Sequence, residues 1–120
     1  MKPFSRSDRV GGLIKQVMAE LLNKHISDPR LTGITITDVE VSRDLRLAKI
    51  YFAASGGRDA AKGALEAFER ARGFVKRELA QRMTLRYMPD LQFYYDESLE
   101  YGARIDKLLK AVKKDHADDH

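Results

Sequence analysis

The stretch from Asp59 to Arg86 decides the fold, and it reads DAAKGALEAFERARGFVKRELAQRMTLR. Apolar residues recur at helical spacing on both sides of the short segment Ala71-Arg72-Gly73. Glycine is costly inside a helix and is readily accommodated in a turn. We therefore predict two short helices that are separated by a kink at Ala71 and Gly73.

Positive charge gathers around this predicted kink. The stretch carries six cations close to two acids: Arg70, Arg72, Lys76, Arg77, Arg82 and Arg86, with Glu69 and Glu78. Such a density of cations on a small helical unit fits a surface that binds a phosphate backbone. It fits ordinary solvated helix faces equally well, and the density alone does not separate the two interpretations.

The composition describes one small domain. The chain has 120 residues, of which 43% are hydrophobic and 33% are charged, and its net charge is +4 with a pI near 9.4. That balance permits a polyanionic partner without requiring one. The absence of cysteine excludes disulfides and thiolate metal sites. No apolar run approaches the ~20 residues that span a membrane, so we expect a cytoplasmic protein. We expect one domain over residues 1–112 and a frayed tail over 113–120.

The remaining elements follow from capping and alternation. In chain order we expect a helix from Ser5 or Ser7 that ends before Asp28-Pro29, strands over 34–41 and 47–52, the helix pair, a strand over 90–95 and a helix from Asp96. The alternation within 34–41 changes phase, which indicates a bulge near Thr37 and Asp38. The short link to 47–52 predicts an antiparallel pair, and we expect an α+β fold.

A search for reaction chemistry identifies no catalytic site. Of the histidines, His25 falls near a helix end, and His116 and His120 fall in the predicted loose tail. The serines fall at caps and turns, and the glycines form neither a P-loop nor a dinucleotide fingerprint. A small hydrolase would need a pocket with convergent titratable groups, which no pattern here indicates. We predict no enzyme, no metal site and no cofactor.

The basic residues are the strongest functional signal, because arginine and lysine on fixed elements can hold phosphates without reading sequence. We expect one RNA-binding surface that comprises Arg30, Arg43, Arg46, Lys49, Arg72, Lys76, Arg77 and Arg86. Tyr51 and Tyr94 lie on the strand parity opposite to the core. They fit either base stacking or packing against neighbours.

The predicted order α-β-β-α-α-β is that of a type II KH domain, which binds RNA with a GXXG loop between two helices. This chain has no two glycines three residues apart, and Ala71-Arg72-Gly73 stands at the corresponding place. With its flanking motifs the chain resembles the ribosome-binding factor A family of bacterial small-subunit assembly factors. The matching motifs are Asp28-Pro29-Arg30-Leu31, Val41-Ser42-Arg43-Asp44-Leu45, Ala48-Lys49-Ile50-Tyr51, Ala71-Arg72-Gly73-Phe74, Leu85-Arg86-Tyr87-Met88-Pro89-Asp90-Leu91 and Phe93-Tyr94-Tyr95-Asp96-Glu97-Ser98.

The resemblance implies a specific role. Such a protein binds free or immature 30S subunits, contacts 16S rRNA near the decoding region and assists late maturation, including that of the 5′ end, without catalysis. Its role is greatest in the cold, and an Ala-X-Gly kink, here Ala71 and Gly73, replaces the GXXG loop. We expect a monomer that binds neither membrane nor small-molecule substrate. Two alternatives stay open: a generic KH-like module for single-stranded RNA without a ribosomal role, and a protein-interaction module.

Overall fold

A computed structural model of the chain describes residues 5–24, 26–98 and 109. Its elements are α1 (Arg6–Lys24), the short 3-10 helix η1 (Pro29–Leu31), β1 (Ile34–Val41), β2 (Leu47–Ala54), α2 (Gly57–Arg82) and β3 (Asp90–Tyr95). The expected C-terminal helix, apart from Ser98 and Leu109, and the expected tail lie outside the described residues, as do all three histidines.

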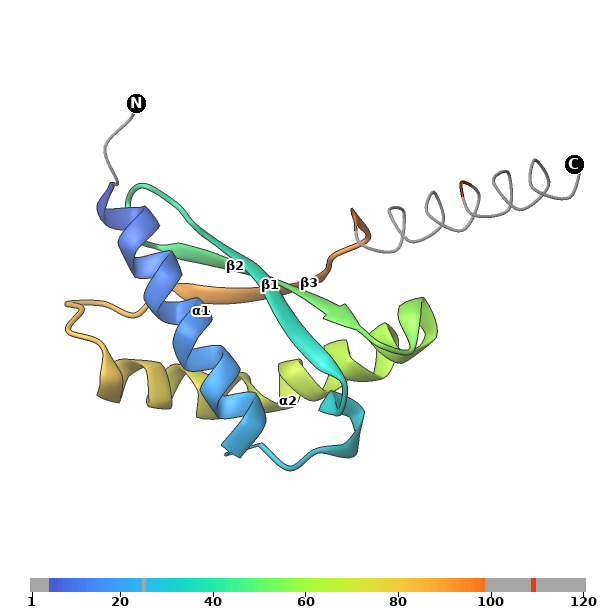
Figure 1. The fold of residues 1–120 in the computed structure, drawn as a ribbon. Coiled ribbons are helices and arrows are strands. Elements are labelled where there is room, and N and C mark those ends of the chain that lie inside the picture. Colours follow the sequence, from blue (N-terminus) through green and yellow to red (C-terminus); the bar gives the residue numbers. More distant parts are fainter. Residues whose placement is uncertain (1–4, 25, 99–108, 110–120) are drawn as a thin grey trace, which may run out of the picture.

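The three strands form one sheet in the order β1-β2-β3 (Figure 1). β1 and β2 are antiparallel, as predicted, and the register shifts between Ile36 and Asp38, which confirms the predicted bulge. β3 lies parallel to β2 on its other side. A parallel pair needs a crossover connection, and α2 supplies it.

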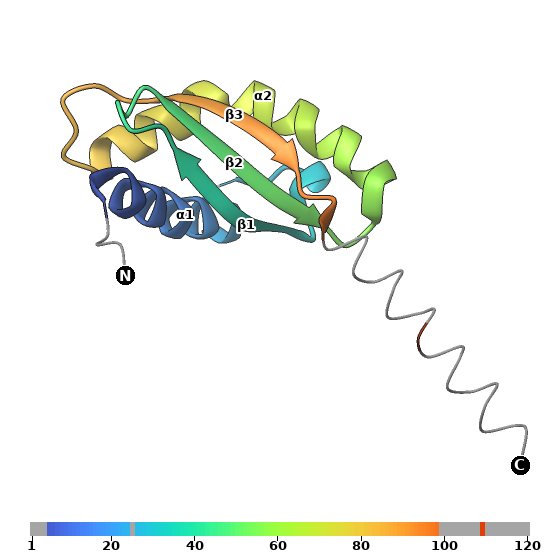
Figure 2. The same ribbon diagram turned by 90° about the horizontal axis from the view of Figure 1, so that it is seen from above.

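Both long helices cover the same face of the sheet (Figures 1 and 2), and among the described elements none covers the opposite face, which we call the open face. The covered face carries the core side chains Ala48, Ile50 and Phe52 of β2, all fully buried, as their alternation predicts. Phe68 of α2 packs between Phe52 and Phe93 of the sheet. The α+β class and the KH-like arrangement of the elements are therefore confirmed.

Two local features fix α1 on the sheet. The amide of Asp8 donates to Ser5 Oγ, and the amide of Ser5 donates to Asp8 Oδ2, both at 3.2 Å. This reciprocal cap confirms that the helix begins after Ser5. Gly11 is buried against β1, where an added Cβ would lie 2.9 Å from the carbonyl oxygen of Val39. A larger residue at Gly11 would therefore push the helix away from the sheet.

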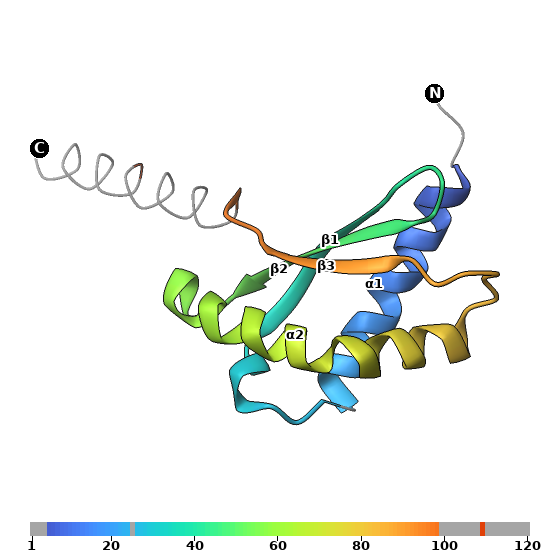
Figure 3. The same cartoon turned by 180° about the vertical axis from the view of Figure 1, so that it is seen from behind.

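The predicted interruption of the second helical stretch is wrong. α2 runs without a break from Gly57 to Arg82, and Gly73 does not have a positive φ. The buried Phe68 and Val75 lie seven residues apart, which is close to two helical turns, so one continuous helix buries both. The free energy gained by that burial outweighs the cost of placing Gly73 in a helix. The axis of α2 bends along its length as the helix wraps over the core (Figure 3).

We expect replacement of Gly73 by alanine to raise the free energy of unfolding by about 0.5–1 kcal/mol, because alanine favours the helix. The added Cβ would meet only Arg77 Nη1, at 3.9 Å. Gly57→Ala is the matched control, since that site is equally open but has a φ of +73°. The control should lower stability by about 1 kcal/mol. Urea unfolding measures both, and shifts in the same direction would contradict the assigned backbone conformations.

Candidate nucleic-acid interface

The eight predicted cations do not form one surface, so that expectation is wrong. Lys49 pairs across the sheet with Glu40 of β1 and with Gln92 of β3. Its neighbours Ala48 and Ile50 point into the core beneath the helices. Because side chains alternate along a strand, Lys49 points to the open face, away from every cation on α2.

The open face also carries the two tyrosines that were predicted to lie there. The rings of Tyr51 and Tyr94 stack on each other, with centroids 5.5 Å apart and an interplanar angle of 27°. The hydroxyl of Tyr51 donates to Glu40 Oε2 at 3.4 Å, and that of Tyr94 donates to Gln92. The predicted parity is confirmed, and the observed contact is packing between neighbours; base stacking on these rings stays a prediction.

Arg72 and Lys76 lie on the flank of α2 that faces β3, and acids balance both. Arg72 binds Glu69, and its guanidinium carbon lies 6.0 Å from the centroid of the Phe93 ring. Lys76 Nζ donates to Asp90 Oδ1 at 3.2 Å. The contacts with Phe93 and Asp90 join α2 to β3, and the two ion pairs reduce the charge that is available to a phosphate.

Arg30 is tied into the turn that precedes β1. Its Nη2 and Nε donate to the carboxylate of Asp28 at 2.8 and 3.1 Å, and its Nη1 lies 3.6 Å from Glu66 of α2. The side-chain hydrogen bonds from Arg30 hold the pKa of Asp28 below its ordinary value. With two acidic partners, Arg30 joins the turn to α2 and has little charge left for a ligand.

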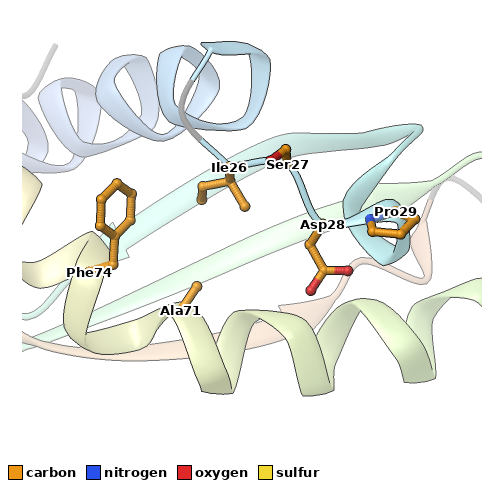
Figure 4. A pocket seen from close by; sticks show the side chains of 6 residues that line it. All are labelled: Ile26, Ser27, Asp28, Pro29, Ala71 and Phe74. Carbon is orange, nitrogen blue, oxygen red and sulfur yellow. The ribbon is translucent and has the colours of Figure 1, made fainter.

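A groove of about 480 Å³ lies between this turn and the middle of α2 (Figure 4). It is lined by Ile26, Ser27, Asp28, Pro29, Ala71 and Phe74. Ala71 and Phe74 project from α2 toward Ile26 and the turn (Figure 4). We call this space the α2 groove. Its floor is apolar, and Ala71 of the Ala71-Arg72-Gly73 segment lines it.

Two arginines without an ion pair among the described residues border the α2 groove. Arg70 and Arg77 lie seven residues apart and so share one flank of α2 with Phe74. Neither forms an ion pair within 4 Å with an acid in the described part of the chain. Arg70 is close enough to Asp28 to contribute to its lowered pKa. Arg70 was missing from the predicted site residues, although its spacing from Arg77 could have identified it.

The other predicted cations lie at one end of the molecule. Arg46 and Arg86 line a second groove, of about 650 Å³, together with Arg6 at the start of α1. We call this the end groove. Arg43 is exposed in the β1–β2 turn beside it. The structure therefore brings two predicted residues together in the end groove, and it separates them from Lys49 and from the α2 groove.

The sequence model of the family described as ribosome-binding factor A matches residues 6–109. The chain belongs to the ribosome-binding factor A family. Ribosome-binding factor A of Desulfatibacillum aliphaticivorans is 45% identical over 112 residues, which cover 93% of this chain and 91% of that protein. The Staphylococcus carnosus factor is 44% identical over 109 residues, covering 91% and 95%.

Solved structures of ribosome-binding factor A share the fold. The crystal structure of the Thermus thermophilus factor aligns with a TM-score of 0.66 at 29% identity, covering 74% of this chain and 94% of that one. A model of the T. thermophilus factor fitted into an electron-microscopy map of a 30S complex aligns with a TM-score of 0.61 at 30% identity, covering 72% and 91%. Both confirm the KH-like fold of the family.

Metal clusters, membrane spans and shifted pKa values also bear on the function of the described residues. Among them, no three His, Cys, Asp or Glu side chains are grouped to hold a metal. No helix in the described ranges is long and apolar enough to cross a membrane. The lowered pKa values of Asp44 and Asp96 arise first from hydroxyl hydrogen bonds of Ser42 and Ser98, which are structural contacts.

Proposed function

We propose that this chain binds immature 30S subunits through 16S rRNA and assists their late maturation, including that of the 5′ end, without catalysing a reaction. One observation carries the proposal: the family match spans residues 6–109, and a family member that aligns with this chain has been fitted into a 30S complex. The exposed cations of the two grooves are consistent with an rRNA partner, because exposed cations bind phosphates independently of sequence.

The mechanism is differential binding. A rigid domain that binds one arrangement of rRNA more tightly than another shifts the population toward the first. The exposed cations of the α2 groove and the end groove can contact phosphates of the preferred arrangement. We assign direct phosphate contacts to Arg43, Arg46, Arg77 and Arg86, with Arg70 added. The elements that carry the phosphate contacts are held in place by Arg30, Arg72 and Lys76. Lys49 is a separate contact on the open face. We also place the protein in the cytoplasm, as a monomer.

Sedimentation with purified ribosomal particles tests the proposal. We expect the protein to sediment with 30S particles, preferentially immature ones, and neither with 50S particles nor with bulk mRNA. Binding should fall steeply as salt rises, because phosphate contacts release counterions. Equal binding to mRNA would favour a generic KH-like module. Failure to bind any RNA at low salt would favour the protein-interaction alternative.

A further inference from the structure

Three separate segments of the chain meet at the end groove. Arg6 comes from the first residue of α1, Arg46 from the β1–β2 turn, and Arg86 from the loop between α2 and β3. Figure 2 shows these three segments together at one end of the molecule. The volume of about 650 Å³ lies within the range of about 300–1,000 Å³ that is typical of small-ligand clefts.

The two acids that line the end groove accept hydrogen bonds, and its three arginines form no ion pair with the acids of the described residues. Asp44 accepts the hydroxyl of Ser42 at 2.7 Å and the amide of Arg46 at 3.2 Å, and these bonds lower its pKa. Asp90 accepts Lys76 Nζ at 3.2 Å. Within residues 5–24 and 26–98, none of the three arginines of the groove lies within 4 Å of an acid oxygen. Their charge therefore remains available to an anion.

The turn that presents Arg46 is rigid and strained. Leu45 has a φ of 61°, in the left-handed region that costs a leucine free energy. Ser42 holds the turn from both sides, because its carbonyl accepts the amide of Leu45 at 2.9 Å and its hydroxyl accepts that of Leu47 at 3.0 Å. The amide of Asp90 donates to the carbonyl of Arg46 at 2.8 Å. The backbone of Arg46 is thus held beside β3 before any ligand arrives.

An exposed aromatic side chain completes the groove. Tyr87 is 74% exposed, and the guanidinium carbon of Arg86 lies 5.4 Å from the centroid of its ring. A tyrosine in that position offers a flat face to solvent directly beside cations. Aromatic platforms next to basic grooves are how proteins hold single-stranded nucleic acid, with bases stacked and phosphates paired.

We propose that the end groove binds an unpaired segment of RNA, with its phosphates held by Arg46, Arg86 and Arg6 and one base stacked on Tyr87. A duplex is a poorer ligand, because its bases are already stacked and paired. This subsite lies apart from the α2 groove, with which it shares no lining residue. The inference rests on the proposed function and specifies the form of RNA that this end of the molecule takes.

Fluorescence anisotropy with a labelled single-stranded RNA of about ten nucleotides tests the subsite, with the same sequence as a duplex for comparison. Tyr87→Ala should weaken binding of the single strand about ten-fold, and Tyr87→Phe should preserve it, since stacking needs only the ring. Arg46→Gln should lower the slope of log affinity against log salt by about one, because binding then releases one counterion fewer. Leu13→Ala, at an exposed apolar side chain of α1 that lines neither groove, is the control and should leave binding unchanged.

The outcomes separate this inference from the proposed function. Sedimentation of the unaltered protein with 30S particles is measured in parallel. If the protein binds 30S but Tyr87→Ala binds the single strand normally, the subsite is overturned and the proposed function stands. Equal affinity for single strand and duplex would also overturn it. So would a result in which millimolar inorganic phosphate displaces the RNA equally well from the wild type and from Tyr87→Ala, because the site would then bind any anion. Circular dichroism of each variant establishes that the fold is intact.

Discussion

Replacing Phe68 with alanine is expected to lower the free energy of unfolding by about 3–5 kcal/mol. Phe68 is fully buried at the centre of the covered face. Its ring stacks on Phe93 with centroids 4.7 Å apart and an interplanar angle of 5°, and it lies 5.2 Å from the Phe52 ring. The truncation removes apolar contact with both strands at once and leaves a cavity. Because small domains are stable by about 5–15 kcal/mol, the variant should be partly unfolded at moderate temperature.

Phe74 provides the matched control on the same helix. It lines the α2 groove and is only partly buried, so Phe74→Ala should cost about 1 kcal/mol, several-fold less than the core substitution. Urea unfolding followed by circular dichroism measures both variants. Equal losses would show that the two rings are buried to the same extent, which would contradict the packing of α2 across Phe52 and Phe93.

The sheet could be predicted because strands show their core face in sequence. Alternate residues of 47–52 are branched, aromatic or small, and the phase change in 34–41 requires a bulge if both halves are to face one core. The structure has that bulge between Ile36 and Asp38. These features are local, so residue order alone determines them.

The break in α2 was wrongly predicted because propensity was weighed without packing. Gly73 by itself disfavours a helix, but the seven-residue spacing of Phe68 and Val75 places both on one buried stripe. Tertiary burial decides such cases. Counting the stripe across the glycine, and not on each side of it, would have predicted one helix.

The layout of the cations was harder to predict, because it depends on contacts between distant segments. Which basic side chains are free depends on acids elsewhere in the chain. Lys76 binds Asp90, and Arg82 lies 2.7 Å from Glu20. Only the assembled fold shows that Lys76 is paired with Asp90 and that Arg77 has no ion pair among residues 5–24 and 26–98. The spacing of Arg70 and Arg77 was visible in the sequence, and the adjacent groove was not.

Reversing the charge of the α2 groove with Arg70→Glu and Arg77→Glu is expected to weaken binding to 30S particles by roughly a hundredfold at physiological salt, because two phosphate contacts are replaced by repulsion. The slope of log affinity against log salt should fall by about two. Both side chains are exposed and make no ion pair in the described ranges, so the melting temperature should change little. Sedimentation at several salt concentrations measures the effect.

The control must carry the same change of net charge on another surface. Lys15→Glu with Lys62→Glu meets that condition, because both side chains are exposed, one on α1 and the other in the first half of α2. A general electrostatic attraction to the ribosome would weaken equally in both double variants, since it depends on net charge. A positioned contact at the α2 groove would be lost only in the first. Similar weakening in both would therefore remove the α2 groove from the interface and leave the end groove as the remaining candidate for a specific contact.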